Sequence, residues 1–274
     1  MKRIKTLLVA AVASAMLATP VLAKCSNNAN GFEAFKQDFA KTARANGVGR
    51  KGLQALAGAK YLTKVIAYDK RQARSFKKAG RTKANIDRYY RRIVKNMGGI
   101  NNVRARVRRN AGWLRGIERK YGVPKEVLVA IWGKETGFGG FTGRIDTINA
   151  LASLSHDCRR PGLFRPNLVA ALKILDKGWI PRSKMRGAAH GELGQVQFLA
   201  KNYLTYARDG DGNGRRDLIR SSRDALASAA YYLQSNGWQR GGSYAPGSRN
   251  FRVLNSWNES TAYQHAISRI ASQL

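Results

Sequence analysis

Apolar side chains recur at helical spacing along much of the chain. In residues 31–45, the sequence GFEAFKQDFAKTARA places Phe32, Phe35 and Phe39 at intervals of three and four. This spacing predicts an amphipathic helix whose aromatic face docks on a core. Residues 61–120 contain further helical segments, namely RRIVKNM, VRARVRRN and LRGIERKYG, and their polar positions are mostly arginine and lysine.

The helical pattern continues through the second half of the chain. Residues 145–178 predict two helices that are broken at Pro161 and Pro166, because proline removes a helical hydrogen bond. Residues 221–238 predict another helix, which an Asn-Gly pair would end. Alternating strand patterns are scarce and short, with NFRVLNSW at residues 250–257 as the best candidate. The pattern therefore predicts a mainly α fold with a small β element.

One predicted helix, residues 124–136, carries an acid on its apolar face. It begins at a proline and ends before a glycine-rich segment, and Val127, Leu128, Ile131 and Glu135 share one face. Burial and the negative end of the helix dipole both disfavour a charged carboxylate there. Such an acid would stay protonated and could give a proton to a leaving oxygen. A buried structural glutamate explains the pattern equally well.

Two glutamines occupy a turn punctuated by glycine. The sequence GELGQVQF, residues 191–198, contains Gln195 and Gln197. Their amides suit hydrogen bonding to sugar hydroxyl and acetamido groups. The three glycines that follow Glu135 would let a polymeric ligand approach the backbone closely.

The sequence DGDGNG is similar to the opening of a calcium-binding loop. The twelfth position holds Arg220 instead of an acid, so Asp224 would have to reach back from outside a loop of standard length. The expected ligands of a structural Ca²⁺ are Asp209, Asp211, Asn213, the carbonyl of Arg215, and Asp224. A metal-free turn rich in Asp and Asn is the alternative. No cofactor is expected for catalysis, since His156, His190 and His265 lack metal-ligand spacing.

Charge and the N-terminus indicate the compartment. Residues 1–23 have a basic start, an apolar run and a small-residue cleavage site, which together predict a secretory signal. Lys24 precedes Cys25 where a lipoprotein would have a small residue, so we expect no lipid anchor. The chain has 50 Lys and Arg against 16 Asp and Glu, a net charge of +34. We expect a periplasmic or secreted monomer that is attracted to anionic cell-wall or outer-membrane surfaces, and we do not expect it to bind nucleic acid.

Two cysteines would remain after cleavage of the signal. Because the predicted compartment permits disulfides, we expect one bond between Cys25 and Cys158. Two unrelated buried thiols are the alternative.

Five segments in order resemble the lytic murein transglycosylase B family of peptidoglycan-cleaving enzymes. They are YGVPKEVLVAIWGKETGFG, TINALASLSHDCRR, GELGQVQF, YARDGDGNGRRDL with DALASAAYYLQSNGW, and NFRVLNSWNESTAYQHAI. The resemblance implies a lysozyme-like α+β core over residues 111–274, joined to a helical N-terminal part over residues 24–110, with a groove for a glycan strand.

The resemblance also implies a reaction and its residues. Glu135 would act alone, first as acid and then as base, in non-hydrolytic cleavage of the MurNAc-GlcNAc β-1,4 bond that leaves 1,6-anhydroMurNAc ends. Sugar contacts would come from Gln197, Tyr232, Trp257 and Asn258.

Two neighbouring functions share these features. A hydrolytic lysozyme needs a second carboxylate about 5 Å from the acid, or about 6.5 to 9.5 Å away, for which Asp146, Asp157 and Glu192 are candidates. A non-catalytic cell-wall-binding protein of the same fold should have lost Glu135 or the glutamine turn, and the chain keeps both.

Overall fold

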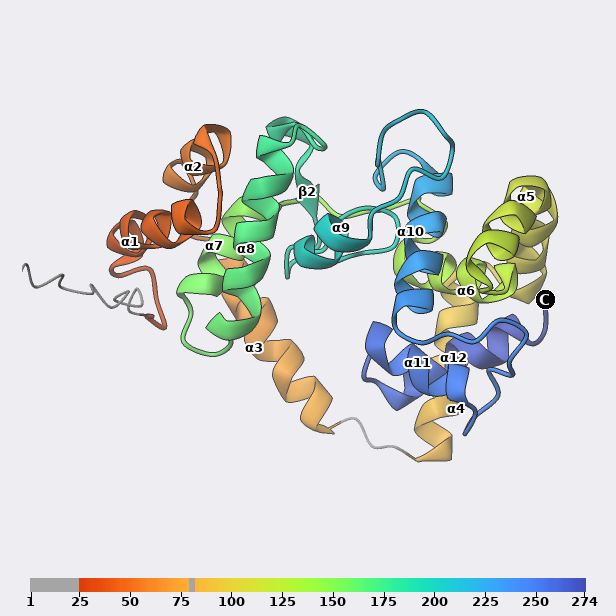
Figure 1. Cartoon of the computed structure of the whole chain (residues 1–274). Helices are drawn as coiled ribbons and strands as arrows, with labels where there is room; N and C mark the ends of the chain where they lie inside the picture. The colour runs from red at the N-terminus through yellow and green to blue at the C-terminus, as the bar shows by residue number, and fades with distance from the viewer. Residues whose placement is uncertain (1–24, 79–81) are drawn as a thin grey trace, which may run out of the picture.

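The computed structural model describes residues 25–78 and 82–274, so the signal sequence predicted for residues 1–23 lies outside the described residues (Figure 1). The described residues form twelve α-helices, one short 3-10 helix and two short strands. The elements in chain order are α1 (Phe32–Ala45), α2 (Arg50–Ala57), α3 (Thr63–Lys78), α4 (Lys83–Asn96), α5 (Ile100–Tyr121), α6 (Lys125–Thr136), β1 (Ile145–Asp146), α7 (Thr147–His156), α8 (Pro161–Asp176), η1 (Arg182–Lys184), β2 (Arg186–Gly187), α9 (Ala200–Tyr206), α10 (Ser222–Ser235), α11 (Arg249–Trp257) and α12 (Thr261–Ala271).

The first helices pack on a helix pair from the middle of the chain. Helices α1 and α2 contact α7 and α8, and the aromatic face predicted for α1 is buried. Phe32 and Phe35 pack against the ring of His156 at centroid distances of 5.5 and 5.2 Å. Cys25 and Cys158 form the predicted disulfide beside this cluster, with their Cα atoms 5.0 Å apart.

A second group of helices surrounds α6. Helix α5 contacts α6 and α10, while α12 contacts both α6 and α4. Residues 127–133 of α6 are buried on every side, so the helix is a core element and has no simple amphipathic face. The N-terminal helices therefore contact two separate parts of the remaining chain, and the division expected after residue 110 falls inside α5.

Two local predictions were wrong. Residues 250–257 form helix α11 and not a strand, because Ser248 caps the helix by accepting the N–H of Phe251, and Phe251 and Leu254 share a buried face. The only strand pair among the described residues is antiparallel, β1 with β2, and it joins Ile145 to Gly187.

The second wrong prediction concerns Pro166, which lies inside α8 without ending it. Its missing N–H leaves the carbonyl of Gly162 without a helical partner, but Gly162 is exposed and water can supply one. The next carbonyl, that of Leu163, accepts the Asn167 side-chain amide at 2.9 Å. Pro161 occupies the first position of α8, where proline is favourable. Packing of α8 against α7 and α9 therefore outweighs the free-energy cost of a proline inside the helix.

Among the described residues, we find no helix with both the length and the apolarity needed to cross a bilayer.

Candidate active site

Glu135 occupies the last turn of α6, with 14% of its side chain exposed. Gly137 follows in the left-handed conformation, at φ 58°, and ends the helix. The Oε1 atom of Glu135 accepts hydrogen bonds from the Tyr263 hydroxyl at 2.7 Å and from the Trp257 Nε1 at 3.3 Å. The carboxyl group is thus held by two donors from the C-terminal helices, and part of it reaches solvent.

Two tyrosine hydroxyls lie within the electrostatic reach of Glu135. Burial, reinforced by the charge of Glu135, raises the pKa of Tyr263 well above its usual value. Burial and the same carboxylate raise the pKa of Tyr89 to about 12. Both tyrosines are therefore protonated at any physiological pH, and Tyr263 always has a proton to donate to Glu135.

A lysine lies on the other side of the carboxyl group. The Lys134 Nζ is 3.5 Å from the Oε2 atom of Glu135 and 5.3 Å from the centre of the Tyr263 ring. A cleft of about 320 Å³ opens here, and Arg92 from α4 also lines it. Positive charge therefore faces a carboxylate that has lost its proton.

The glycines after Glu135 serve packing at close range. Gly139, at φ 81°, lies so near the Gln195 side chain that a Cβ atom would come within 2.6 Å of its Oε1. Thr136 strengthens the same junction by donating its hydroxyl to the Gln195 carbonyl at 2.6 Å and accepting the Gly139 N–H at 3.0 Å. The segment thus locks the end of α6 onto the 191–198 turn.

The two glutamines of that turn have different surroundings. Gln195 is only 6% exposed; its Oε1 accepts the Trp132 indole N–H and its Nε2 donates to the Ile219 carbonyl. Gln197 is half-buried at φ 52°, and its amide nitrogen donates to the carbonyls of Thr142 and Gly194. Among the described residues, no group donates to the Gln197 Oε1 atom, which leaves this acceptor for a ligand.

An aromatic cluster adjoins the acid. Tyr232 packs at 5.3 Å against Trp257, and Phe198 lies 5.6 Å from Tyr232 and 5.3 Å from Trp257. The Tyr232 hydroxyl donates to the Ser256 carbonyl at 2.5 Å, and burial raises its pKa. Asn258 ends α11, with its Oδ1 bonded to the Ser260 N–H. Trp257 thus contacts Glu135 directly, Tyr232 packs on Trp257, and Asn258 follows Trp257 at the end of α11.

The acidic loop brings three carboxylates together. Oxygen atoms of Asp209, Asp211 and Asp224 lie within 4.8 Å of one another, which is the reach-back that the sequence required of Asp224. Asp224 is fully buried and also accepts the N–H groups of Gly210 and Asp217 at 2.8 and 2.7 Å. Carboxylate oxygens are the ligands that Ca²⁺ prefers, so this donor set suits a hard cation.

The other two expected metal ligands belong to the same loop. The Asn213 Oδ1 accepts the Arg215 N–H at 2.8 Å, which shapes the turn. Arg220, at the twelfth position, ion-pairs with Asp217 at 2.5 Å, so its charge is partly compensated.

The three candidate second carboxylates are engaged elsewhere. Asp146 caps α7 by accepting the Asn149 N–H and ion-pairs with Arg182 at 2.5 Å. Asp157 accepts the Arg159 N–H at 2.8 Å. Glu192 accepts the backbone N–H of His190 at 2.9 Å and lies 3.4 Å from its Nδ1.

Tyr263, Tyr89 and Lys134 are the neighbours of Glu135 that sequence reasoning missed. Tyr263 shares helical spacing with Ile267 and Ile270, so it resembles an ordinary core residue. Lys134 directly precedes the acid, and its position at the end of a buried helix is a signal that could have been used.

Comparison with known proteins supports one family. The family model described as "Transglycosylase SLT domain" matches residues 31–248. The membrane-bound lytic murein transglycosylase B of Escherichia coli (strain K12) is 34% identical over 126 residues. That alignment covers 46% of this chain and 35% of the relative, so the chain matches only about a third of the relative's length.

Solved structures have the same fold. SltB3 from Pseudomonas aeruginosa, in complex with NAG-NAM-pentapeptide, is 28% identical with a TM-score of 0.78 over 89% of this chain and 79% of that one. The Escherichia coli lytic transglycosylase SLT35, in complex with calcium, is 22% identical with a TM-score of 0.74 over 93% and 97% of the two chains, which shows the fold alone. The mainly α, lysozyme-like fold is therefore confirmed. Because the family model spans most of the chain, this protein belongs to the transglycosylase SLT domain family.

Proposed function

We propose that this protein is a peptidoglycan lytic transglycosylase that cleaves the MurNAc-GlcNAc β-1,4 bond and leaves 1,6-anhydroMurNAc ends. The observation that carries the proposal is a single, partly exposed Glu135 whose carboxyl group is oriented by Tyr263 and Trp257. The SltB3 structure with bound NAG-NAM-pentapeptide supports the substrate class.

The reaction uses one carboxyl group twice. Protonated Glu135 gives its proton to the glycosidic oxygen as the bond to the anomeric carbon breaks, while the substrate's acetamido group stabilises the cation that develops. The carboxylate then takes the proton from the C6 hydroxyl of the same sugar, which attacks the anomeric carbon and closes the anhydro ring. Lys134, at 3.5 Å, would stabilise the carboxylate between the two transfers.

The neighbouring groups would hold the sugar so that internal attack outruns water. We assign this role to Gln197, Tyr232, Trp257 and Asn258, and positioning of this kind can contribute several kcal/mol. For Gln195, whose amide bonds Trp132 and Ile219, we propose support of the site and not a sugar contact. The engagement of Asp146, Asp157 and Glu192 by other groups favours this mechanism over a two-carboxylate hydrolase.

The test is digestion of purified sacculi followed by mass spectrometry of the products. Glu135→Gln keeps the shape but has no proton to give, so turnover should fall by orders of magnitude. Glu259→Gln, at an exposed glutamate, is the matched control and should retain activity. Anhydro ends are expected from the unmodified protein. Reducing MurNAc ends would identify a hydrolase, and no products at all would identify a binding protein.

We also propose one structural Ca²⁺ at Asp209, Asp211, Asn213, the Arg215 carbonyl and Asp224, supported by the convergence of three carboxylates. The ion would bind the folded state only, so calcium should raise the melting temperature and chelator should lower it. Asp211→Asn should abolish that difference, whereas Asp38→Asn, on α1 with 44% of its side chain exposed, should keep it. Equal melting curves for the unmodified protein in calcium and in chelator would show a metal-free turn.

The basic surface would attach the protein to the anionic envelope. Helix α5 exposes Arg108, Arg109, Arg115, Arg119 and Lys120, and none of the five has an ion-pair partner among the described residues. Such attraction is screened by salt, with a Debye length of about 8 Å at physiological ionic strength. Binding to sacculi should therefore weaken steeply as salt rises.

A charge-matched pair of variants localises this attraction. One variant changes four of the α5 arginines to glutamine, and the control changes four exposed cations near α2 and α3. The substituted positions are Arg108, Arg109, Arg115 and Arg119 in the first variant, and Arg50, Lys51, Lys60 and Lys64 in the control. Equal loss of affinity in both variants would assign the attraction to net charge and not to α5.

The remaining proposals concern the chain's organisation. We propose that residues 1–23 are a secretory signal, that the protein is a periplasmic or secreted monomer, and that residues 24–110 and 111–274 are a helical N-terminal part and a lysozyme-like core. Mass determination of the exported protein would locate the cleavage site.

A further inference from the structure

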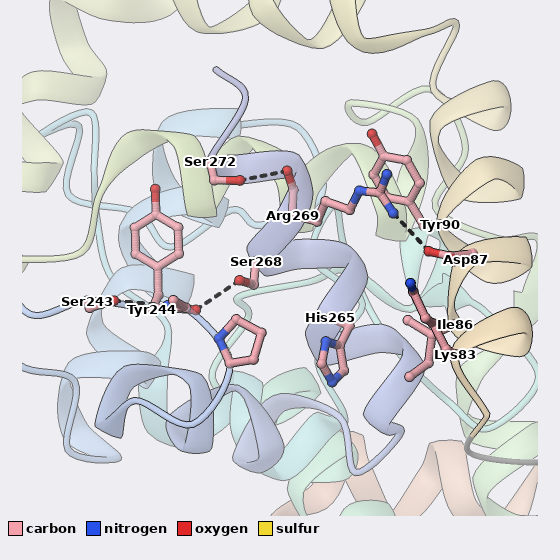
Figure 2. Close-up of a pocket in the computed structure, with 12 residues that line it drawn as sticks. Lys83, Ile86, Asp87, Tyr90, Ser243, Tyr244, His265, Ser268, Arg269 and Ser272 are labelled. Carbon is pink, nitrogen blue, oxygen red and sulfur yellow. Dashed lines mark hydrogen bonds and ion pairs between the residues drawn. The ribbon is translucent and has the colours of Figure 1, made fainter.

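A second cavity, of about 840 Å³, opens on the protein surface between α4, α12 and the 243–246 loop (Figure 2). Its volume is within the range of ligand-binding pockets, which is roughly 300 to 1,000 Å³. The residues that line it come from three segments of the chain, 83–90, 243–246 and 265–272.

This cavity lies on the opposite face of α12 from the candidate active site. Tyr263, Ile267 and Ile270 form the buried face of α12, and Tyr263 contacts Glu135. By helical spacing, His265 and Ser268 project from the other side of the helix, into the cavity. A ligand bound there would contact neither Glu135 nor the aromatic cluster around Trp257.

One wall of the cavity is rigid and has little unpaired charge. Arg269 ion-pairs with Asp87 at 2.9 Å, and its guanidinium lies 4.0 Å from the centre of the Tyr90 ring (Figure 2). On the opposite side, Tyr244 packs on Trp238 at 6.3 Å. The cavity therefore offers ring faces and the side chains of Ile86 and Pro246 to an apolar ligand body.

Besides the Ser243 hydroxyl and the His265 imidazole, the cavity contains two serine hydroxyls that already donate their protons, and one lysine. The Ser268 hydroxyl donates to the Tyr244 carbonyl at 2.9 Å, and the Ser272 hydroxyl donates to the Arg269 carbonyl at 3.0 Å (Figure 2). Since each of these two hydroxyls already donates its proton within the protein, its oxygen can only accept a hydrogen bond from a ligand. Lys83 is exposed and has no ion-pair partner among the described residues, so it is a free cation at the rim.

We propose that this cavity binds a short peptide of small apolar residues through its free C-terminal carboxylate. The carboxylate would pair with Lys83, the peptide N–H groups would donate to the serine oxygens, and the small side chains would cover the tyrosine rings. A phosphate group fits Ser268 and Ser272 less well, because these two hydroxyl oxygens can only accept and would face its acceptor oxygens. The proposal rests on the proposed function to the extent that peptidoglycan would supply such peptides, as the pentapeptide bound to SltB3 illustrates.

The cavity would then be a second site at which the protein binds its substrate. A peptide from one strand could bind here while a glycan strand lies at Glu135, because the two sites are on opposite sides of α12. The free carboxylate requirement would favour peptides whose C-terminus has not been cross-linked.

The probe is acetyl-Ala-Ala-Ala with a free carboxylate, titrated into the isotope-labelled full chain and followed by NMR. Shifts are expected at residues 243–246 and along α12. The amidated peptide should bind about tenfold more weakly, as should the unmodified peptide to Lys83→Gln, because each change removes one charge-assisted contact. Lys64→Gln, an exposed cation on α3, is the matched control and should leave the affinity unchanged.

Three results would overturn the proposal. These are no shift in the cavity at 10 mM peptide (roughly the weakest useful affinity), equal binding of the amidated peptide, or displacement of the peptide by an equal concentration of inorganic phosphate. Ala245→Trp provides a second check, because it places a large ring at an exposed position of the rim and should block binding without disturbing the core. The probe contains no sugar, so its binding is measured independently of whether sacculi are cleaved.

Discussion

Removal of the Tyr263 hydroxyl tests the proposed role of Glu135 in proton transfer. Tyr263→Phe keeps a ring that is 1% exposed in the core and deletes only the oxygen that lies 2.7 Å from the Glu135 Oε1. The raised pKa of Tyr263 means that this oxygen always carries its proton, so the variant removes a hydrogen-bond donor and nothing that titrates near neutral pH.

The magnitude follows from the change in charge during the reaction. A hydrogen bond to a charged group contributes about 1.5 to 3 kcal/mol, and one between neutral groups about 0.5 to 1.5 kcal/mol. In the proposed reaction Glu135 changes from neutral to charged as it donates its proton, so the bond would strengthen by about 1 to 1.5 kcal/mol as the glycosidic bond breaks. The variant should therefore lose roughly five- to tenfold in kcat.

The assay is the release of soluble products from sacculi, with melting temperature measured in parallel. Tyr203→Phe is the control, because the Tyr203 hydroxyl donates to the Arg216 carbonyl at the same 2.7 Å but does not contact Glu135. Tyr203→Phe should lose stability and keep kcat. If Tyr263→Phe retained kcat within a factor of two, the hydroxyl would be a structural group and our account of the acid would fail.

Three further predictions concern stability. Replacing Cys25 and Cys158 with serine opens a loop with a sequence separation of 133 residues. The free energy of unfolding measured in urea titrations should fall by about 5 kcal/mol, and a loss below 1 kcal/mol would refute the chain-entropy account. Burial lowers the pKa of His156, so the unfolded chain binds more protons below about pH 6.5; stability should fall as pH drops through this window, and His156→Phe should flatten the slope. Burial alone would raise the pKa of Asp69, but hydrogen bonds from Arg159 and Arg160 outweigh it and lower the pKa, so this carboxylate stabilises the fold above about pH 4 and the stabilisation is lost progressively as the pH falls below that value. Asp69→Asn should cost about 3 to 5 kcal/mol at neutral pH, and this cost should shrink as the pH is lowered below about 4.

Local signals in the sequence were enough for the helix that bears the acid. A proline at its start, a glycine at its end and the spacing of its apolar residues predicted 124–136, and the helix spans Lys125–Thr136. These signals act within a few residues, so no knowledge of distant contacts was needed. The same reasoning failed for Pro166 and for residues 250–257, where packing and an N-cap decided the outcome.

The surroundings of Glu135 depend on contacts with residues far away in the sequence, so they were harder to predict from the sequence. Tyr263 reaches Glu135 across 128 residues of sequence, and its spacing in α12 is the same as that of a core residue. Gln195 and Gln197 share one turn and one side-chain chemistry, yet one amide bonds protein groups and the other leaves an oxygen open. Only the three-dimensional arrangement distinguishes a supporting amide from one that can contact a ligand.

The separation between Glu135 and its donors also matters while the chain is being made. The ribosome adds Glu135 near the middle of the chain and adds Trp257 and Tyr263 only 122 and 128 residues later. A nascent or prematurely terminated chain that stops before residue 257 has the glutamate without either donor. The proposed catalytic site is therefore completed last, and an incomplete copy of the protein would lack the oriented acid that the proposed reaction requires.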